Sequence, residues 1–189
     1  MKIPAQYIFK GQSQNYPKQE WIKHCGLFCA VHVLKSLGVE VKEQHPRSFH
    51  RSWVRKLLGQ TLGSLIEFTL HTHGVEVHAG NMRNKTYDER LSFLKSEISK
   101  NRPVILHVGD GYKFNQYHIS RAYLVSHWIV IYGYDDKEQV FYIYDSCVNK
   151  PDTKIPIGNV ARYYREIIRD WGRGAIPGCE FYKYISVSK

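Results

Sequence analysis

Residues 25–38 read CGLFCAVHVLKSLG, and this stretch decides the fold. When its residues are placed at intervals of about 100°, apolar side chains cover most of the helix circumference, as they do in a buried helix. The remaining residues share one narrow face: Cys25, Cys29, His32 and Ser36. The pattern therefore predicts a central buried helix over residues 25–37, which begins with a cysteine and is closed by Gly38.

Helical patterns dominate the first half of the chain, and strand patterns dominate the second half. Further helices are expected at residues 50–58, 61–73, 87–100 and 159–171. Strands are expected at residues 75–78, 103–108, 124–134, 139–144 and 180–187. We therefore predict a single α+β domain over residues 1–189 with two lobes. The helical lobe is expected over about residues 19–100 and the antiparallel sheet lobe over about residues 101–189. The central buried helix of the first lobe is expected to pack on the sheet of the second.

Local signals support three of these segments. Thr86 and Glu89 have the spacing of a capping box, in which each residue binds a free backbone N–H at the start of a helix. Asp135 and Asp136 lie between two runs of β-branched and aromatic residues, so the two runs are expected to pair as a hairpin. The polar loop 109–122, which contains Tyr112 and His118, is long enough to suggest a border of a functional cleft.

The chain is basic but otherwise ordinary in composition. Its 189 residues include 27 Lys and Arg against 17 Asp and Glu, which gives a net charge of +10, and 43% are hydrophobic. These values exclude a disordered, collagen-like or coiled-coil protein. No run of about 18 apolar residues is present, so we expect no integral membrane segment.

Two further features bear on location and redox state. Residues 1–18 lack the apolar stretch of a secretory signal, so the protein is expected to be cytoplasmic or exported by another route. Four cysteines in a chain of 189 residues are too few for a disulfide scaffold, so we expect reduced thiols.

Cys25 is the candidate nucleophile. A helix N-terminus favours a negative charge through its dipole and its unpaired N–H groups, and a thiol becomes nucleophilic as a thiolate. Gly26 follows it and is small enough to let a substrate carbonyl approach the backbone. Gln19, six residues before Cys25, is a candidate oxyanion donor beside the Cys25 N–H. The alternative is that Cys25 is a buried core thiol, because free cysteine is often buried.

His127 and Asp145 are the candidate partners of Cys25. His127 begins the apolar run HWIVIYGY, and Asp145 ends the apolar run VFYIYD. If these runs pair as a hairpin, the carboxylate reaches the imidazole ring and fixes its tautomer, as the third member of a catalytic triad does. The alternative is a core histidine whose hydrogen bonds are satisfied within the sheet.

These motifs occur in an order that resembles the papain-like cysteine peptidases. The order is Gln-x5-Cys-Gly, then Pro-Val-Ile-Leu, then His-Trp-Ile-Val-Ile, then Tyr-Ile-Tyr-Asp, over residues 19–147. The pattern is most similar to the bacteriocin-leader-processing (double-glycine) peptidases and their stand-alone relatives. The resemblance implies Gln19 in the oxyanion hole, Cys25 as nucleophile, His127 as base and acid, and Asp145 as orienting carboxylate.

The resemblance also implies a peptide or protein substrate. Gly26, Trp21 and Trp128 flank the motif residues and are candidates for lining the substrate cleft. The chain departs from the family where Leu27 follows Cys-Gly and Ser146 follows Asp145, and we expect no fused transporter ATPase. The acceptor therefore stays open: acyltransferases, deamidases and transglutaminase-type enzymes, including secreted effectors, share the same thioester chemistry.

A non-catalytic basic binding module is the alternative from another functional class. In a helix over 159–171 the arginines would line the side opposite the apolar face: Arg162, Arg165, Arg169 and, just beyond it, Arg173. This stripe is a candidate docking surface for an acidic protein or an anionic membrane surface. Nucleic acid is a less favoured partner, because a solvated helix face explains the same stripe.

Metal binding is the remaining rival. Cys25, Cys29 and His32 share a helix face, with His24 beside them, but the paired short spacings of a zinc site are missing. We therefore expect no metal and no cofactor. The other cysteines are expected to be bystanders: Cys29, Cys147 and Cys179.

Overall fold

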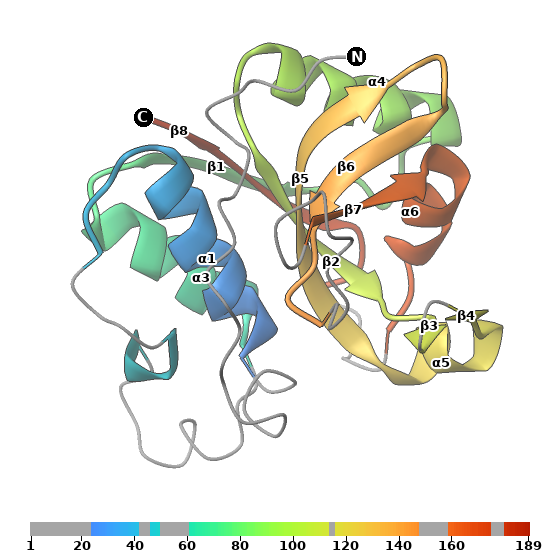
Figure 1. The fold of residues 1–189 in the computed structure, drawn as a ribbon, viewed down its shortest axis with the longest axis horizontal. Helices are drawn as coiled ribbons and strands as arrows, with labels where there is room; N and C mark the ends of the chain where they lie inside the picture. The colour runs from blue at the N-terminus through green and yellow to red at the C-terminus, as the bar shows by residue number, and fades with distance from the viewer. Residues whose placement is uncertain (1–23, 42–45, 50–60, 114–115, 148–158, 175–179) are drawn as a thin grey trace.

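The computed structural model describes residues 24–41, 46–49, 61–113, 116–147, 159–174 and 180–189 (Figure 1). At its centre is a six-stranded antiparallel sheet with the strand order β1-β8-β2-β5-β6-β7. The strands are β1 (Glu76–Asn81), β2 (Val104–Gly109), β5 (Ser126–Asp135), β6 (Val140–Tyr144), β7 (Asn159–Tyr163) and β8 (Lys183–Ser188). Two short strands, β3 (Tyr112–Lys113) and β4 (Gln116–Tyr117), form a separate hairpin.

Helices cover both faces of the sheet. One face packs against α1 (Cys25–Ser36) and α3 (Gly63–Thr72), and the other against α4 (Tyr87–Ser99) and α6 (Tyr164–Asp170). Figure 1 shows these two pairs on opposite sides of the strands. The shorter helices η2 (Pro46–Phe49) and α5 (Ile119–Leu124) lie at the periphery. The predicted α+β class, with a buried helix on an antiparallel sheet, is confirmed.

The central strand β5 distributes its side chains between two hydrophobic cores. Trp128, Val130 and Tyr132 belong to the core beneath α1 and α3. Ile129 and Ile131 belong to the core beneath α4 and α6. This alternation follows from the period of two in a strand, and burial on both faces explains why the run is almost continuously apolar.

The predicted local signals are present in the structure. The Thr86 Oγ1 accepts a hydrogen bond from the Glu89 N–H (3.3 Å), and the Glu89 carboxylate accepts one from the Thr86 N–H (2.7 Å). Gly38 follows α1 with φ +73°, a conformation that glycine adopts without steric cost. β5 and β6 pair as the predicted hairpin.

Two sequence predictions about the fold are wrong. β1 comes from the range assigned to the helical lobe, yet it pairs with β8 in the sheet, and α4 covers the far face of that sheet, so the sheet part begins before residue 100. The predicted helix 159–171 is divided, because residues 159–163 form β7 against β6 and only Tyr164–Asp170 are helical. The predicted helix 50–58 lies outside the described residues.

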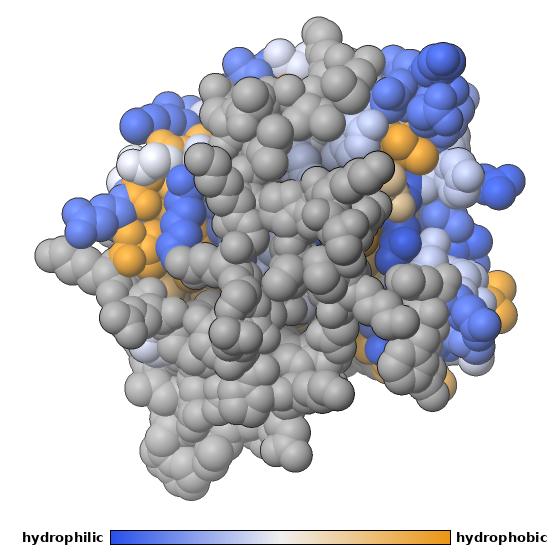
Figure 2. Space-filling view, in the orientation of Figure 1, coloured by the Kyte–Doolittle hydropathy of each residue, from blue (hydrophilic) through white to orange (hydrophobic). Residues whose placement is uncertain are grey.

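The surface of the described part is largely hydrophilic. Figure 2 shows hydrophilic residues over most of the described surface in this view, with small hydrophobic groups at its left and right. Among the described helices, none combines the length and the apolar character needed to cross a membrane.

Replacing Leu34 with alanine is expected to lower the free energy of unfolding by about 2–5 kcal/mol, because its side chain is fully buried in the core beneath α1 and the substitution leaves a cavity. Urea denaturation followed by circular dichroism measures this change. Leu124→Ala is the matched control, because Leu124 is 72% exposed. That control is expected to change the free energy by less than about 0.5 kcal/mol, and equal losses in the two variants would contradict the assigned core.

Candidate active site

A buried histidine and a buried carboxylate meet at one end of the β5–β6 hairpin. His127 is the second residue of β5, and Asp145 directly follows β6. Nε2 of His127 donates to Oδ1 of Asp145 at 2.7 Å, and both residues are buried. The predicted pairing of these two residues is therefore present, and the alternative of a histidine held only by the sheet is not.

The same carboxylate oxygen holds the chain that follows it. The backbone N–H of Cys147 donates to Oδ1 of Asp145 at 2.8 Å. This is a local turn in which an aspartate side chain binds the N–H two residues later. The turn brings the Cys147 Sγ to 3.7 Å from Nδ1 of His127. Cys147 therefore lies beside the His127–Asp145 pair, a position that the sequence analysis did not predict, and its absence from the reaction stays a prediction.

Cys25 lies at the first position of α1, as predicted. It is 8% exposed and belongs to the same core as Trp128 of β5. The His24 side chain at the N-cap makes no capping hydrogen bond, and the first turn carries no acidic residue. The positive end of the helix dipole is therefore not neutralised by a side chain of this turn.

The pKa shifts follow from burial and from these contacts. Burial by itself lowers the pKa of His127, but Cys147, Asp145 and Cys25 together raise it well above 6.5. Burial by itself raises the pKa of Asp145, but His127 and the Cys147 N–H hold it below its usual range. Burial raises the pKa of the Cys147 thiol to about 11, so this thiol is protonated at neutral pH. Asp145 then supplies the negative charge that stabilises the imidazolium.

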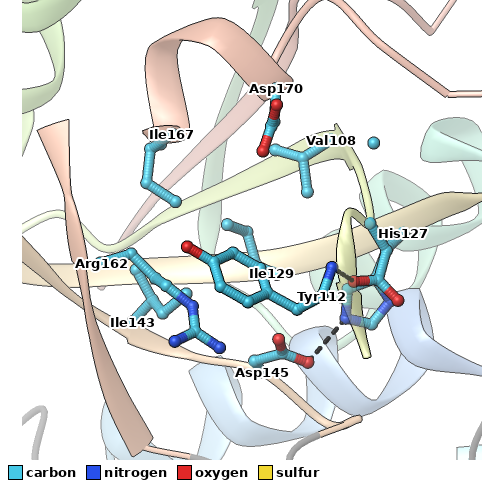
Figure 3. A pocket seen from close by; sticks show the side chains of 11 residues that line it. Val108, Tyr112, His127, Ile129, Ile143, Asp145, Arg162, Ile167 and Asp170 are labelled. Carbon is cyan, nitrogen blue, oxygen red and sulfur yellow. Dashed lines mark hydrogen bonds and ion pairs between the residues drawn. The ribbon is translucent and has the colours of Figure 1, made fainter. Parts of the chain in front are cut away.

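A pocket of about 30 Å³ lies beside the His127–Asp145 pair (Figure 3). Apolar side chains line part of it: Val108, Ile129, Ile143 and Ile167. Polar side chains complete the lining with the pair itself: Asp110, Tyr112, Arg162 and Asp170. This volume holds about two water molecules, so in this conformation only small groups enter it. Tyr112 comes from the predicted polar loop, which does border the pocket.

Two predicted cleft residues have structural roles instead. Trp128 is 1% exposed, and its Nε1 donates to the carbonyl oxygen of Thr61 at 3.0 Å. Because neighbouring residues of a strand face opposite sides, Trp128 lies in the core on the α1 side, and its assignment to the cleft is wrong. At Gly26 a Cβ atom would lie 2.7 Å from Thr61 Cγ2 and 2.8 Å from Ile66 Cδ1, so close packing against α3 requires glycine there.

The predicted arginine stripe does not exist as one solvated helix face. Arg162 lies on β7, and the other three arginines lie on α6 or just after it. Three guanidinium groups stack over tyrosine rings of the β3–β4 hairpin and α5, at 3.7, 4.0 and 4.7 Å from the ring centroids. The stacked pairs are Arg162–Tyr112, Arg169–Tyr117 and Arg173–Tyr123.

Asp170 forms ion pairs with two of these arginines. Its buried carboxylate pairs with Arg169 at 2.9 Å and Arg173 at 3.3 Å, and it accepts a hydrogen bond from the Tyr117 hydroxyl at 2.7 Å. These contacts hold the β3–β4 hairpin against α6. They also pair the charges of Arg169 and Arg173, which the sequence analysis had assigned to a docking surface, with a carboxylate of the same chain. Arg165 and Arg169 are exposed, with the Arg165 guanidinium 5.5 Å from the Tyr163 ring, but Arg169 is engaged by Asp170 and Tyr117, so the four arginines do not form one free stripe.

The predicted non-catalytic thiol on α1 is confirmed as a core residue. Cys29 is fully buried, its Sγ lies 3.2 Å from the Trp128 carbonyl oxygen, and burial raises its pKa well above 9.0. His32 is buried with its ring 4.1 Å from the Tyr144 ring, and burial lowers its pKa to about 3. Gln19, Trp21 and Cys179 lie outside the described residues.

Comparison with known proteins places the chain in a family. The model of the Peptidase_C39 like family matches residues 9–169, which include Cys25, His127 and Asp145. The chain belongs to the Peptidase_C39 like family. Among curated proteins, no sequence match was found.

Solved structures of Peptidase_C39 proteins share the fold. A double glycine motif protease from an AMS/PCAT transporter, solved in complex with the leader peptide, aligns with a TM-score of 0.51 and 14% identity over 100% of this chain and 93% of that chain. A C39-like peptidase from Bacillus anthracis aligns with a TM-score of 0.57 and 13% identity over 100% of this chain and 98% of that chain. The resemblance inferred from the sequence motifs is confirmed.

Proposed function

We propose that this Peptidase_C39 like protein is a cysteine peptidase that cleaves peptide bonds through a Cys25 acyl-enzyme. The observation that carries the proposal is the buried His127–Asp145 hydrogen bond of 2.7 Å. Because Nε2 donates to the carboxylate, Nδ1 is the ring atom left to exchange a proton with a thiol. Cys25 lies at the first position of α1, and its charge as a thiolate raises the pKa of His127.

The proposed reaction has two steps. Nδ1 of His127 takes the proton of the Cys25 thiol, and the thiolate attacks the carbonyl carbon of the scissile bond. Backbone N–H groups at the start of α1, with Gln19 as the proposed side-chain donor, stabilise the oxyanion. His127 then protonates the leaving amine as the C–N bond breaks and a thioester forms. Finally, His127 deprotonates a water that attacks the thioester, which releases the acid and restores the thiol.

A peptide is the proposed substrate class. The double glycine motif protease is bound to a leader peptide, and its fold spans the whole of this chain. The small pocket beside His127 and Asp145 accepts only small groups in this conformation.

The experiment is a screen of the purified protein against synthetic peptides, with and without a double glycine, followed by mass spectrometry. Hydrolysis gives a free acid at the new C-terminus. In a parallel reaction with an added primary amine, a transferase would give the amide instead. Cleavage to the free acid that is blocked by an iodoacetamide-type probe supports the proposal. Products only in the presence of the amine would favour the transglutaminase-type alternative.

A further inference from the structure

A second thiol meets the imidazole at the atom that the proposed reaction uses. The Cys147 Sγ lies 3.7 Å from Nδ1 of His127, and Cys147 is partly buried. In the described part of the chain, the group of metal-ligating side chains is His127, Asp145 and Cys147, whose ligand atoms lie within 4.8 Å of one another. This group is different from the helix face Cys25, Cys29 and His32 that the sequence pattern made the metal candidate.

The sulfur–nitrogen distance matches the bite of a tetrahedral cation. Zinc binds sulfur at about 2.3 Å and imidazole nitrogen at about 2.05 Å, and a tetrahedral angle between the two bonds puts the ligand atoms about 3.6 Å apart. The observed distance is 3.7 Å. The two side chains can therefore share one cation without a movement of the backbone.

Asp145 is arranged to orient the histidine rather than to bind the cation itself. Its Oδ1 accepts from Nε2 of His127 at 2.7 Å and from the Cys147 N–H at 2.8 Å. The carboxylate thus fixes the ring with its proton on Nε2, which leaves the lone pair of Nδ1 directed away from Asp145. A histidine that binds a metal through one nitrogen and a carboxylate through the other is a common arrangement.

We propose that Cys147 and His127 form a site for a thiophilic divalent cation such as Zn²⁺, and that a cation bound there inhibits the peptidase. The inhibition part rests on the proposed function. Nδ1 is the atom that takes the proton of Cys25, so a cation on Nδ1 removes the general base. Binding releases the thiol proton of Cys147, because the thiolate is the ligand. The remaining coordination positions are filled by water.

Cation binding is tested without any substrate. The probe is Cd²⁺ alone, added to the Cys25→Ala protein, and the readout is the ultraviolet charge-transfer absorption of a cadmium thiolate. One equivalent of Cd²⁺ is expected to produce the band in this variant, which excludes the proposed nucleophile as its source. The Cys25→Ala/Cys147→Ala protein is expected to lose the band, and Cys25→Ala/Asp145→Ala is expected to bind roughly 10–100-fold more weakly.

The matched control is Cys25→Ala/Cys29→Ala, because Cys29 is a core thiol held against the Trp128 carbonyl. This variant is expected to keep the band, and a band that follows Cys29 instead of Cys147 would overturn the site. In the activity arm, Cys147→Ala is expected to raise the Zn²⁺ concentration for half inhibition at least about tenfold. Equal inhibition of both proteins would overturn the inhibitory role. If no peptide is cleaved, the Cd²⁺ result still decides the site.

Discussion

Cys25→Ala is expected to lower kcat/KM for a cleaved peptide by about 10⁴-fold or more, because no other group at the start of α1 can form the acyl-enzyme. The loss is expected in kcat, since the thiol makes a covalent bond in the reaction and contributes little to substrate binding. Steady-state kinetics on the peptide found in the screen measures both constants. Circular dichroism is expected to show an unchanged fold, because alanine is a good helix former.

Cys147 makes this experiment more demanding than in a protein with one thiol near the histidine. The Cys147 sulfur is within hydrogen-bond reach of Nδ1 of His127. Cys25 instead affects His127 through its charge, which raises the pKa of the histidine. A pKa of about 11 makes Cys147 a poor nucleophile at neutral pH, because little of its thiol is then thiolate. Full activity of Cys25→Ala together with loss of activity in Cys147→Ala would therefore assign the nucleophile to Cys147. Cys29→Ala, which removes a core thiol, controls for the loss of a sulfur from α1.

The sequence predicted the parts of the site that lie on regular elements. The buried helix with Cys25 at its start, the β5–β6 hairpin and the approach of Asp145 to His127 all follow from periodicity and from one turn. Alternation along a strand also indicated that Trp128 and His127 face opposite sides of the sheet. The burial of Trp128, which excludes it from the cleft, depends on its packing in the core beneath α1. An aspartate side chain often binds the backbone N–H of the residue two positions later. The spacing of Asp145 and Cys147 therefore carried a signal that Cys147 lies close to Asp145.

The segment that contains the arginines could not be predicted in the same way. The apolar residues Val160, Tyr164 and Ile167 fit a helical repeat, and no local signal shows that residues 159–163 pair with β6. Strand formation there depends on a partner strand elsewhere in the chain, which local propensity does not include. Once β7 forms, Arg162 points into the pocket that Tyr112 also lines, and the expected charged stripe is divided.

Asp145→Ala is expected to lower kcat by roughly 10⁴-fold, the size of loss seen when the carboxylate of a catalytic triad is removed. The loss follows from the two hydrogen bonds that the Asp145 carboxylate accepts. His127 loses the acceptor at 2.7 Å that fixes its tautomer, and the Cys147 N–H loses the acceptor at 2.8 Å that holds the turn. Removal of one partner of a buried pair is also expected to cost about 3–5 kcal/mol of stability.

Asp145→Asn separates these two consequences. The Cys147 N–H requires an acceptor, so it is expected to fix the amide with its oxygen at the Oδ1 position. That oxygen then still accepts from Nε2 of His127, and the ring keeps its tautomer without the negative charge. We therefore expect the asparagine variant to retain at least about tenfold more activity than the alanine variant and to unfold at higher urea concentration. Equal kcat values for the two variants would mean that charge, and not orientation, is the contribution of Asp145.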